Sequence, residues 1–343
     1  MLKARKSNDR AAFTAALFFF FRKYLPLLFF VIASIFFTWI AYASTHPSLP
    51  CKNHPLTLYS NQCKDDLKLV FLRAIQSAKS SIFIIIYGLT DKEVIDALKA
   101  KAAEGIVVKI FYDPSGSKHL EDQLPGLALP LKSSGLMHKK ILVIDHKKVL
   151  LGSANLTETS LSMHDNLVLG LYHKGLGSFF EKSLLDNYRF DIKGQPIELW
   201  SLPEPQKKAL DRILSEINSA KTSLRICMFT FTNKDILQAL LNAKARGVKI
   251  EVAFDYYSAR GSSKETLDAL KVGGVDTYTS KGGKLLHHKW CLIDSNTLIL
   301  GSTNWTGAAF SKNDDCMIFL HDLTPPQKKV MEKIWNTLDF AVP

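Results

Sequence analysis

The sequence contains one ten-residue pattern twice, as LMHKKILVID at residues 136–145 and as LLHHKWCLID at residues 285–294. In each copy a histidine is followed two residues later by a lysine and five residues after that by an aspartate. The polar residues held in register are His138, Lys140 and Asp145 in the first copy and His287, Lys289 and Asp294 in the second, 149 residues later. This repeat constrains the fold strongly, because each copy must form the same local structure.

The repeat extends upstream of these motifs. Residues 77–79 (SAK) correspond to residues 219–221 (SAK), and Asp113 corresponds to Asp255, both at an offset of 142 residues. The second copy therefore has seven more residues between this aspartate and its histidine motif, within residues 256–283. We expect the insertion to lie at the surface, where extra residues between elements are tolerated.

Each copy predicts the same order of helices and strands. In the first copy, a helix over residues 65–78 precedes an apolar, β-branched strand at residues 81–89. A second helix ends at Gly105, and another strand follows at residues 107–113. The order strand, helix, strand indicates a right-handed crossover and parallel pairing.

The histidine motif then begins a hairpin in each copy, and a closing helix follows, capped by Ser178 in the first copy and by Thr324 in the second. Two prolines in LWSLPEP, residues 199–205, mark the boundary between the copies. The predicted fold class is α/β. We expect two pseudo-twofold-related domains, residues 65–198 and 199–343, with mixed, largely parallel sheets.

A leader precedes the repeat. Residues 1–23 are basic, and residues 24–43 (YLPLLFFVIASIFFTWIAYA) form a run of 20 residues without charge. As a helix, this run is about 30 Å long, which matches the hydrocarbon core of a bilayer. We predict a transmembrane anchor with the N-terminus in the cytoplasm and the body across the membrane. A signal segment cleaved after Ala43, which would make the protein secreted, is the alternative. Residues 44–64 are interpreted as a linker.

The chain has five cysteines. Cys51 and Cys63 lie just after the apolar run, on the side of a membrane where disulfides form, and the sequence leaves a bridge between them open. Cys227, Cys291 and Cys316 are expected to be buried as small apolar side chains. Neither C-x-x-C nor H-E-x-x-H occurs in the chain, so a cysteine-based zinc site is not expected. We predict neither a metal nor a cofactor.

The charge of the chain favours anionic partners. The formal net charge is +12 and the pI is near 9.3. Such a balance suits nucleic acid, phospholipid headgroups or a membrane surface, and it does not choose among them.

The motif residues indicate a site for a phosphoryl group. Side chains alternate along a strand, so His138 and Lys140 lie on one face, and so do His287 and Lys289. After each hairpin comes a short polar segment, GSAN at residues 152–155 and GSTN at residues 301–304. Phosphoryl oxygens accept hydrogen bonds from cationic and amide donors. The predicted phosphate-binding residues are therefore Ser153, Asn155, Ser302 and Asn304.

Two histidines also explain why the motif is doubled. Cleavage of a phosphodiester without a metal needs a nucleophile on one side of phosphorus and a proton donor for the leaving oxygen on the other. One imidazole can attack and form a phosphohistidine, while the opposite imidazolium protonates the departing alkoxide. We therefore predict a single active site shared by both copies.

The pattern H-x-K-x4-D followed by G-S-x-N, twice in one chain, resembles the motif of the phospholipase D superfamily. The resemblance covers about residues 65–340. In that family a downstream acid orients the catalytic histidine. The matching residues here are Asp165 and Asp315, with Asp314 left as an alternative because the spacing is 13 residues from Gly152 but 14 from Gly301.

The resemblance also implies roles within the motif. Asp145 and Asp294 complete the predicted catalytic set, although in the family this aspartate more often supports structure than chemistry. By the same resemblance, His138 is the nucleophile and His287 the acid. His288 and His146 are interpreted as structural. Three upstream lysines are interpreted as steering residues for anions, namely Lys132, Lys281 and Lys284.

The function that these observations favour is a membrane-tethered phospholipase D. Its predicted partner is a phospholipid, which it would hydrolyse to phosphatidate and a headgroup alcohol; transfer of the phosphatidyl group to another alcohol uses the same mechanism. The alternative is a membrane-associated phosphodiesterase acting on nucleic acid, since the basic body also suits a polyanion. A non-catalytic binding module is disfavoured, because both motifs are intact.

Overall fold

The computed structural model describes residues 2–45, 47–183, 186–204, 206 and 208–341. The chain divides into two compact units, residues 1–47 and 48–343. The first unit contains helix α1 (Leu2–Thr45), with Pro26 inside it. Its segment Phe20–Ile40, with a mean hydropathy of 1.8, is long and apolar enough to cross a membrane, a test that a signal sequence also passes. The predicted span at residues 24–43 overlaps this segment.

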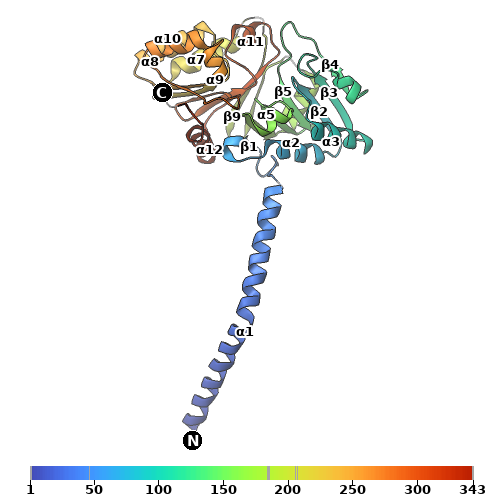
Figure 1. The fold of residues 1–343 in the computed structure, drawn as a ribbon, viewed down its shortest axis with the longest axis vertical. Coiled ribbons are helices and arrows are strands. Elements are labelled where there is room, and N and C mark those ends of the chain that lie inside the picture. The colour runs from blue at the N-terminus through green and yellow to red at the C-terminus, as the bar shows by residue number, and fades with distance from the viewer. Residues whose placement is uncertain (1, 46, 184–185, 205, 207, 342–343) are drawn as a thin grey trace. The chain divides into compact units, whose positions relative to one another are not determined.

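The second unit contains two mixed sheets (Figure 1). The first sheet has seven strands. In spatial order they are β1 (Leu56–Ser60), β7 (Leu167–Tyr172), β6 (Lys148–Gly152), β5 (Lys140–Ile144), β2 (Ser81–Ile86), β3 (Val107–Tyr112) and β4 (Ala128–Pro130). The second sheet has eight strands. Their order is β12 (Asp276–Thr279), β11 (Lys249–Phe254), β10 (Ser223–Met228), β13 (Lys289–Ile293), β14 (Thr297–Gly301), β15 (Cys316–Leu320), β9 (Gln195–Ser201) and β8 (Tyr188–Ile192).

The strand directions confirm the prediction that both sheets are mixed. The prediction that they are largely parallel is wrong. The predicted crossovers pair β2 with β3 and β10 with β11 in parallel. In the first copy, β5 pairs antiparallel with both β6 and β2. In the second copy, β13 pairs antiparallel with both β14 and β10. Most ladders in both sheets are therefore antiparallel, because each motif strand returns next to the first strand of its own copy.

Two predicted boundaries also differ from the structure. Residues 44–64, interpreted as a linker, include β1, which pairs with β7 at the edge of the first sheet. The first copy was expected to end at residue 198, yet β8 and β9 belong to the second sheet, where β9 pairs with β15. The change from one sheet to the other therefore precedes the prolines of residues 199–205.

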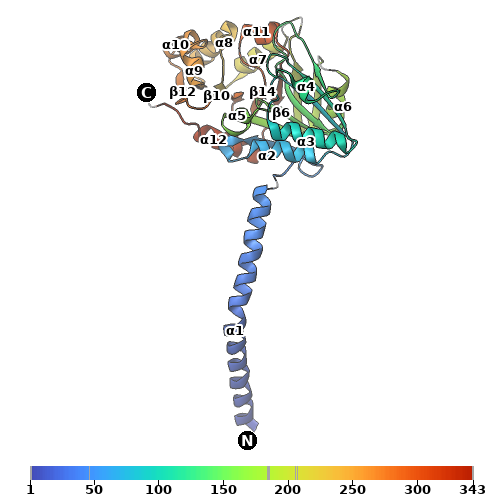
Figure 2. The same ribbon diagram turned by 45° about the vertical axis from the view of Figure 1, so that its right-hand side comes forward.

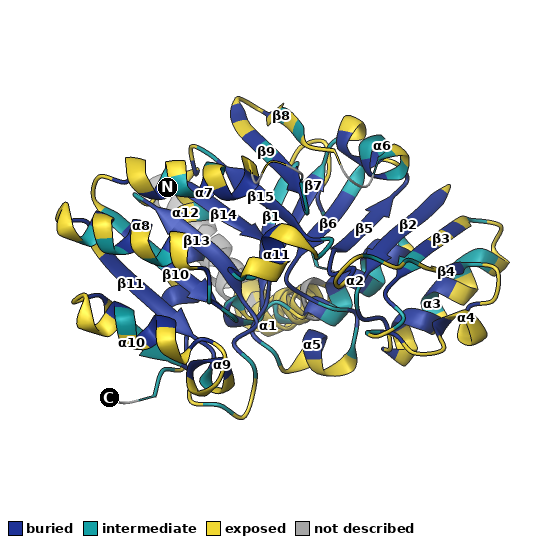
Figure 3. Ribbon diagram, turned by 90° about the horizontal axis from the view of Figure 1, so that it is seen from above, coloured by how far each residue is buried: buried dark blue, intermediate teal, exposed yellow. Residues whose placement is uncertain are grey.

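Helices cover the outer face of each sheet (Figure 2). Over the first sheet, apolar residues of α2 (Leu67–Gln76), α3 (Lys92–Ala103) and α5 (Glu158–Ser162) form one core with Ile82, Ile84 and Ile86 of β2. Over the second sheet, α7 (Lys208–Ser219), α8 (Lys234–Ala245), α10 (Lys264–Val272) and α11 (Gly307–Ser311) form an equivalent core. Figure 3 shows buried strands beneath helices whose outer faces are exposed.

The inner faces of the two sheets share a third core. Because side chains alternate, Phe83 and Ile85 of β2 point away from the helices and pack in the same cluster as Trp290 and Leu292 of β13. The body is therefore a helix–sheet–sheet–helix stack. Helix α12 (Pro325–Asn336) adds Trp335 to this inner core.

The remaining helices are short apart from α6. They are η1 (Asn61–Cys63), α4 (Leu120–Gln123), α6 (Lys174–Lys182) and α9 (Tyr256–Arg260). Thr324 caps α12 through a capping box with Gln327, as predicted. Ser178 does not cap the first closing helix. It lies inside α6, whose N-cap is His173, because the His173 ring accepts the Leu176 N–H.

The cysteines are all free thiols. Cys51 is exposed and Cys63 half-buried, and the bridge between them that the sequence left open is not formed. Cys227, Cys291 and Cys316 are buried in strands, as predicted.

The motif aspartates hold the turn at the far end of each motif strand. Asp145 has a φ of 51° and follows β5, where its Oδ1 accepts the N–H groups of Lys79, Ser80 and Ser81. Asp294 accepts the corresponding N–H groups before β10. Each carboxylate therefore ties the hairpin to the start of the neighbouring strand.

Replacement of Asp145 by alanine is expected to lower the free energy of unfolding by about 2 kcal/mol, because three backbone N–H groups, of which that of Ser81 is buried, and the Ser80 hydroxyl lose a charged acceptor. Burial raises the pKa of Asp145, but the donors of Lys79, Ser80 and Ser81 outweigh it and lower the pKa below 3.8. The contribution is therefore complete above pH 3.8 and is lost as the pH falls through the folded-state pKa. Denaturant unfolding across pH tests this. The exposed Asp276, replaced by alanine, is the control, and equal losses would contradict the assignment.

Candidate active site

The two histidine motifs meet where the halves of the body join. Each motif histidine lies two residues before its strand, and the chain there pairs with the other half. The N–H of His138 donates to the Asp314 carbonyl at 2.7 Å, and the N–H of His287 donates to the Asp165 carbonyl at 2.9 Å. Both side chains are buried, with exposures of 8% and 7%. The pseudo-twofold relation thus brings two distant segments to one place.

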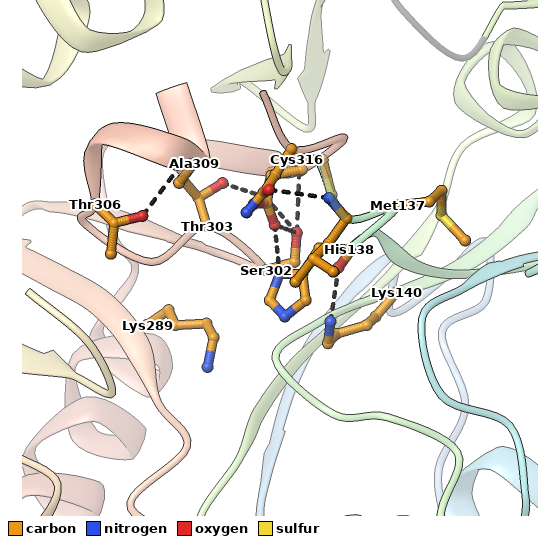
Figure 4. Close-up of polar contacts among 12 residues, drawn as sticks. Met137, His138, Lys140, Lys289, Ser302, Thr303, Thr306, Ala309 and Cys316 are labelled. Carbon is orange, nitrogen blue, oxygen red and sulfur yellow. Dashed lines mark hydrogen bonds and ion pairs between the residues drawn. The ribbon is translucent and has the colours of Figure 1, made fainter. Parts of the chain in front are cut away.

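His138 is held by a carboxylate from the second half. Its Nδ1 lies 2.8 Å from Oδ1 of Asp315, which is fully buried. The Ser302 hydroxyl donates to the same oxygen at 2.6 Å and accepts the Cys316 N–H at 3.0 Å (Figure 4). The structure therefore selects Asp315 rather than Asp314 as the partner of a histidine.

His287 is held by an amide from the first half. Its Nδ1 lies 3.1 Å from Oδ1 of Asn166, to which the Ser153 hydroxyl donates at 2.8 Å. The prediction that Asp165 orients a histidine is therefore wrong. Asp165 forms an ion pair with Lys284 at 2.8 Å instead. The repeat could have identified Asn166, because Asn166 and Asp315 are 149 residues apart, which is also the offset between the two motif histidines.

The motif lysines adjoin the histidines. Lys140 Nζ donates to the His138 carbonyl at 2.6 Å, and Lys289 Nζ donates to the His287 carbonyl at 2.9 Å. Figure 4 shows Lys140 and Lys289 on either side of the His138 ring. Burial lowers the pKa of Lys140 to about 7 and that of Lys289 well below its usual value. A bound anion would offset this burial and favour the charged ammonium groups.

Two aromatic residues that the sequence reading missed pack on these pairs. The Tyr87 ring lies 5.4 Å from the His138 ring and 5.4 Å from Lys140 Nζ. The Phe229 ring lies 5.0 Å from the His287 ring and 4.8 Å from Lys289 Nζ. Tyr87 and Phe229 are 142 residues apart, so they occupy equivalent positions just after β2 and β10. They restrict the imidazoles and favour cations near their ring faces.

The comparisons with known proteins agree with this geometry. The family described as "Cardiolipin synthase, PLD-like domain" matches residues 71–185 and again residues 213–339. The chain belongs to this family. Its two matched segments contain one histidine motif each, and the first ends just before β8, where the chain passes to the second sheet.

Individual relatives of this PLD-like chain match about two fifths of it. A mitochondrial cardiolipin hydrolase from Xenopus laevis is 30% identical over 151 residues, which are 43% of this chain and 70% of that protein. The corresponding protein from Danio rerio is 32% identical over 144 residues, or 40% of this chain and 62% of that protein. The chain thus spans about two thirds of the length of these relatives. The phosphatidylserine synthase of Haemophilus influenzae shares the fold, with a TM-score of 0.64, 14% identity and coverage of 87% and 89% of the two chains.

The serines of the PLD-like site, which were predicted to bind phosphate, have other partners. Ser153 and Ser302 are buried, and their hydroxyls hold Asn166 and Asp315. The asparagines differ from the serines. Oδ1 of Asn155 accepts the Gly88 N–H at 3.3 Å, and the buried Oδ1 of Asn304 has no hydrogen-bond partner among the described residues.

The motif aspartates of this PLD-like chain lie away from the histidines. Asp145 and Asp294 follow the strands that the histidines precede, so each aspartate is seven positions from its histidine along an extended chain, or about 23 Å. They were predicted as members of the catalytic motif, but their oxygens accept hydrogen bonds from the turns described above. Their place in the motif is structural.

Other residues that the sequence singled out have ordinary contacts. His288 is buried and lies 3.1 Å from Gln62 of η1, and His146 contacts Glu181 at 2.5 Å. Lys281 forms an ion pair with Asp339. Lys132 lines a cavity of about 320 Å³ together with Met137 and Asp314. Across residues 2–341, outside the few undescribed positions, no group of three His, Cys, Asp or Glu side chains is arranged to hold a metal.

Proposed function

We propose that this chain is a membrane-anchored phospholipase D-type phosphodiesterase, which hydrolyses phospholipids to phosphatidate and a headgroup alcohol. One observation carries the proposal. Two imidazoles, one from each half, are both tethered through Nδ1, and each has a buried ammonium group beside it. This arrangement suits attack on phosphorus from one side and proton donation from the other.

The chemistry follows from the tethers. A ring held through Nδ1 has Nε2 available for the substrate, either as a lone pair or as an acidic N–H. One Nε2 forms a bond to phosphorus while the other protonates the leaving oxygen. The second ring then removes a proton from water, and the resulting oxygen displaces the first imidazole. Lys140 and Lys289 stabilise the charge on the phosphoryl oxygens throughout.

A phospholipid is the favoured substrate for two reasons. The relatives are named as cardiolipin hydrolases, so an acidic phospholipid is the first substrate to test. Helix α1 contains a segment that can cross a membrane, which would hold the site near lipid. The basic residues before that segment favour a cytoplasmic N-terminus and a body on the opposite side.

The test compares lipid and nucleic acid directly. The full chain in detergent is given mixed vesicles containing cardiolipin or phosphatidylcholine, and in parallel single-stranded and double-stranded DNA. We expect release of phosphatidate or headgroup from vesicles and no nicking of DNA. Nicking of DNA without lipid turnover would show that the substrate of this site is a polynucleotide and not a lipid. Inactivity on both substrates would contradict the proposal.

Turnover is expected to persist in a chelator. Two imidazoles and two ammonium groups supply the nucleophile, the acid and the charge stabilisation, so rates with and without EDTA should agree within about twofold. The measurement is headgroup release from the same vesicles. A loss of more than about tenfold, restored by one divalent ion, would show that a metal takes part.

A further inference from the structure

The two edges of the active site differ in the segment that precedes each motif histidine. In the first copy, the residues before His138 are fastened to the second half of the chain. The hydroxyl of Ser134 donates to the Lys312 carbonyl at 2.9 Å, and the N–H of Leu136 donates to Oδ1 of Asn313 at 3.0 Å. These side chains therefore hold one edge of the site together.

The equivalent edge beside His287 lacks both of these bonds among the described residues. The 149-residue offset places Gly283 at the position of Ser134 and His164 at the position of Asn313. Gly283 has a φ of 81°, a conformation that favours glycine, and a Cβ there would meet no atom within 4 Å. The ring of His164 forms no hydrogen bond with a described residue, so its polar atoms are free to bind a ligand.

His164 lies against the motif histidine of this edge. Its ring centroid is 6.2 Å from that of His287, and its side chain is half-buried. It precedes by two residues Asn166, which holds Nδ1 of His287. Burial lowers the pKa of His164, and the charge of Lys289 acts in the same direction. The ring therefore offers a neutral N–H donor at neutral pH, beside the reacting imidazole.

Two carboxylates act on the His164 ring, and both are occupied. Asp165 forms its ion pair with Lys284 at 2.8 Å. The two oxygens of Asp255 accept backbone N–H groups. A cationic headgroup would therefore find no free carboxylate at this edge, whereas an anionic oxygen would find an imidazole N–H close to a lysine.

We propose that His164 is a specificity-determining residue, which donates a hydrogen bond to an anionic oxygen on the leaving headgroup of the phospholipid. The inference rests on the proposed phosphodiesterase function. The family resemblance makes His287 the acid that protonates the leaving oxygen, so the headgroup leaves on the side where His164 lies. The substrate class is therefore a phospholipid whose leaving part carries its own anionic group.

Cardiolipin and phosphatidylglycerol test this role, because only in cardiolipin does the leaving part carry a second phosphate. Each lipid is given to the full chain in the same uncharged detergent micelles, and initial rates of phosphatidate release are measured. His164→Phe keeps a ring against His287 and removes the N–H donor. We expect KM for cardiolipin to rise about tenfold, as for the loss of one hydrogen bond to a charged group. Its kcat, and both constants for phosphatidylglycerol, should change by less than about twofold.

His164→Asn is the second variant, because asparagine is the residue that the other copy has at this position. It should also raise KM for cardiolipin and leave kcat in place. His119→Asn is the matched control, since the His119 side chain is 81% exposed and lies outside the site. It should leave all four constants unchanged.

Equal losses on the two lipids would show that His164 only packs on His287, and the proposal would be wrong. An unchanged KM for cardiolipin in both His164 variants would overturn it as well. If the unmodified chain hydrolyses cardiolipin alone, a fall in kcat at constant KM is the result that contradicts the role. These outcomes leave the phosphodiesterase function intact. That function fails only if the unmodified chain cleaves neither lipid nor DNA, and the role of His164 then fails with it.

Discussion

Replacing either His138 or His287 with asparagine is expected to lower kcat on the natural substrate by about 10⁴-fold, and replacing both should cost little more. The reason is that the two rings act in one step: attack without a proton donor leaves an unprotonated alkoxide, and a proton donor without a nucleophile has nothing to release. Headgroup release under saturating lipid measures this loss.

The matched control for both variants is His54→Asn, because His54 is an exposed histidine outside either motif. It should keep the full rate. Circular dichroism and thermal unfolding would show that the site variants remain folded. Independent, multiplicative losses in the double variant would mean that the two rings do not share a reaction, and the single active site would have to be abandoned.

Replacing Gly301 with alanine is expected to destabilise the body by about 3 kcal/mol or more and to abolish activity. A Cβ at Gly301 would lie 2.2 Å from the carbonyl oxygen of Cys316, a backbone atom that cannot rotate away. That carbonyl accepts the Ser302 N–H at 2.9 Å, so relief of the clash must displace Ser302 and the Asp315 carboxylate that it holds. Unfolding in denaturant and lipid turnover together measure both effects.

Gly307 provides the control for this substitution. A Cβ there would meet no atom within 4 Å, and the residue begins α11, where alanine favours the helix. Gly307→Ala should therefore leave stability unchanged or slightly improved. Gly152→Ala should behave like Gly301→Ala, since its Cβ would lie 2.2 Å from the Leu167 carbonyl. A stable, active Gly301→Ala variant would show that the packing of β14 on β15 can yield at this point.

The repeat predicted most of what the structure contains, because residues in register at a fixed offset must occupy equivalent positions. His138 and His287 lie two residues before β5 and β13, and the parallel pair after each crossover is present. The predictions failed for strands whose pairing partners lie far away in the sequence. Nothing local in Leu56–Ser60 says that it pairs with β7 more than 100 residues away, and β9 pairs with β15 in the same manner.

The partner of His287 was missed for a different reason. Asp165 is an acid near the expected position, and it was chosen because of its residue type. Its offset from Asp315 is not the 149 residues that separate the two histidines. The amide at Asn166 satisfies the same geometry with no charge, so only the 149-residue offset could have identified it. The serines were misread because a hydroxyl near a phosphate site and a hydroxyl that holds a buried side chain are identical in sequence.

The tethers cross between the halves: Asp315 from the second half holds His138, and Asn166 from the first holds His287. Neither repeat therefore contains the partner of its own motif histidine. Two polypeptides divided between residues 183 and 186 would be inert until they reassociated, and recovered turnover would then report how tightly they bind. Loss of Asp315 or of Asn166 is therefore expected to impair the histidine of the other copy, so the two copies must change together to keep the site.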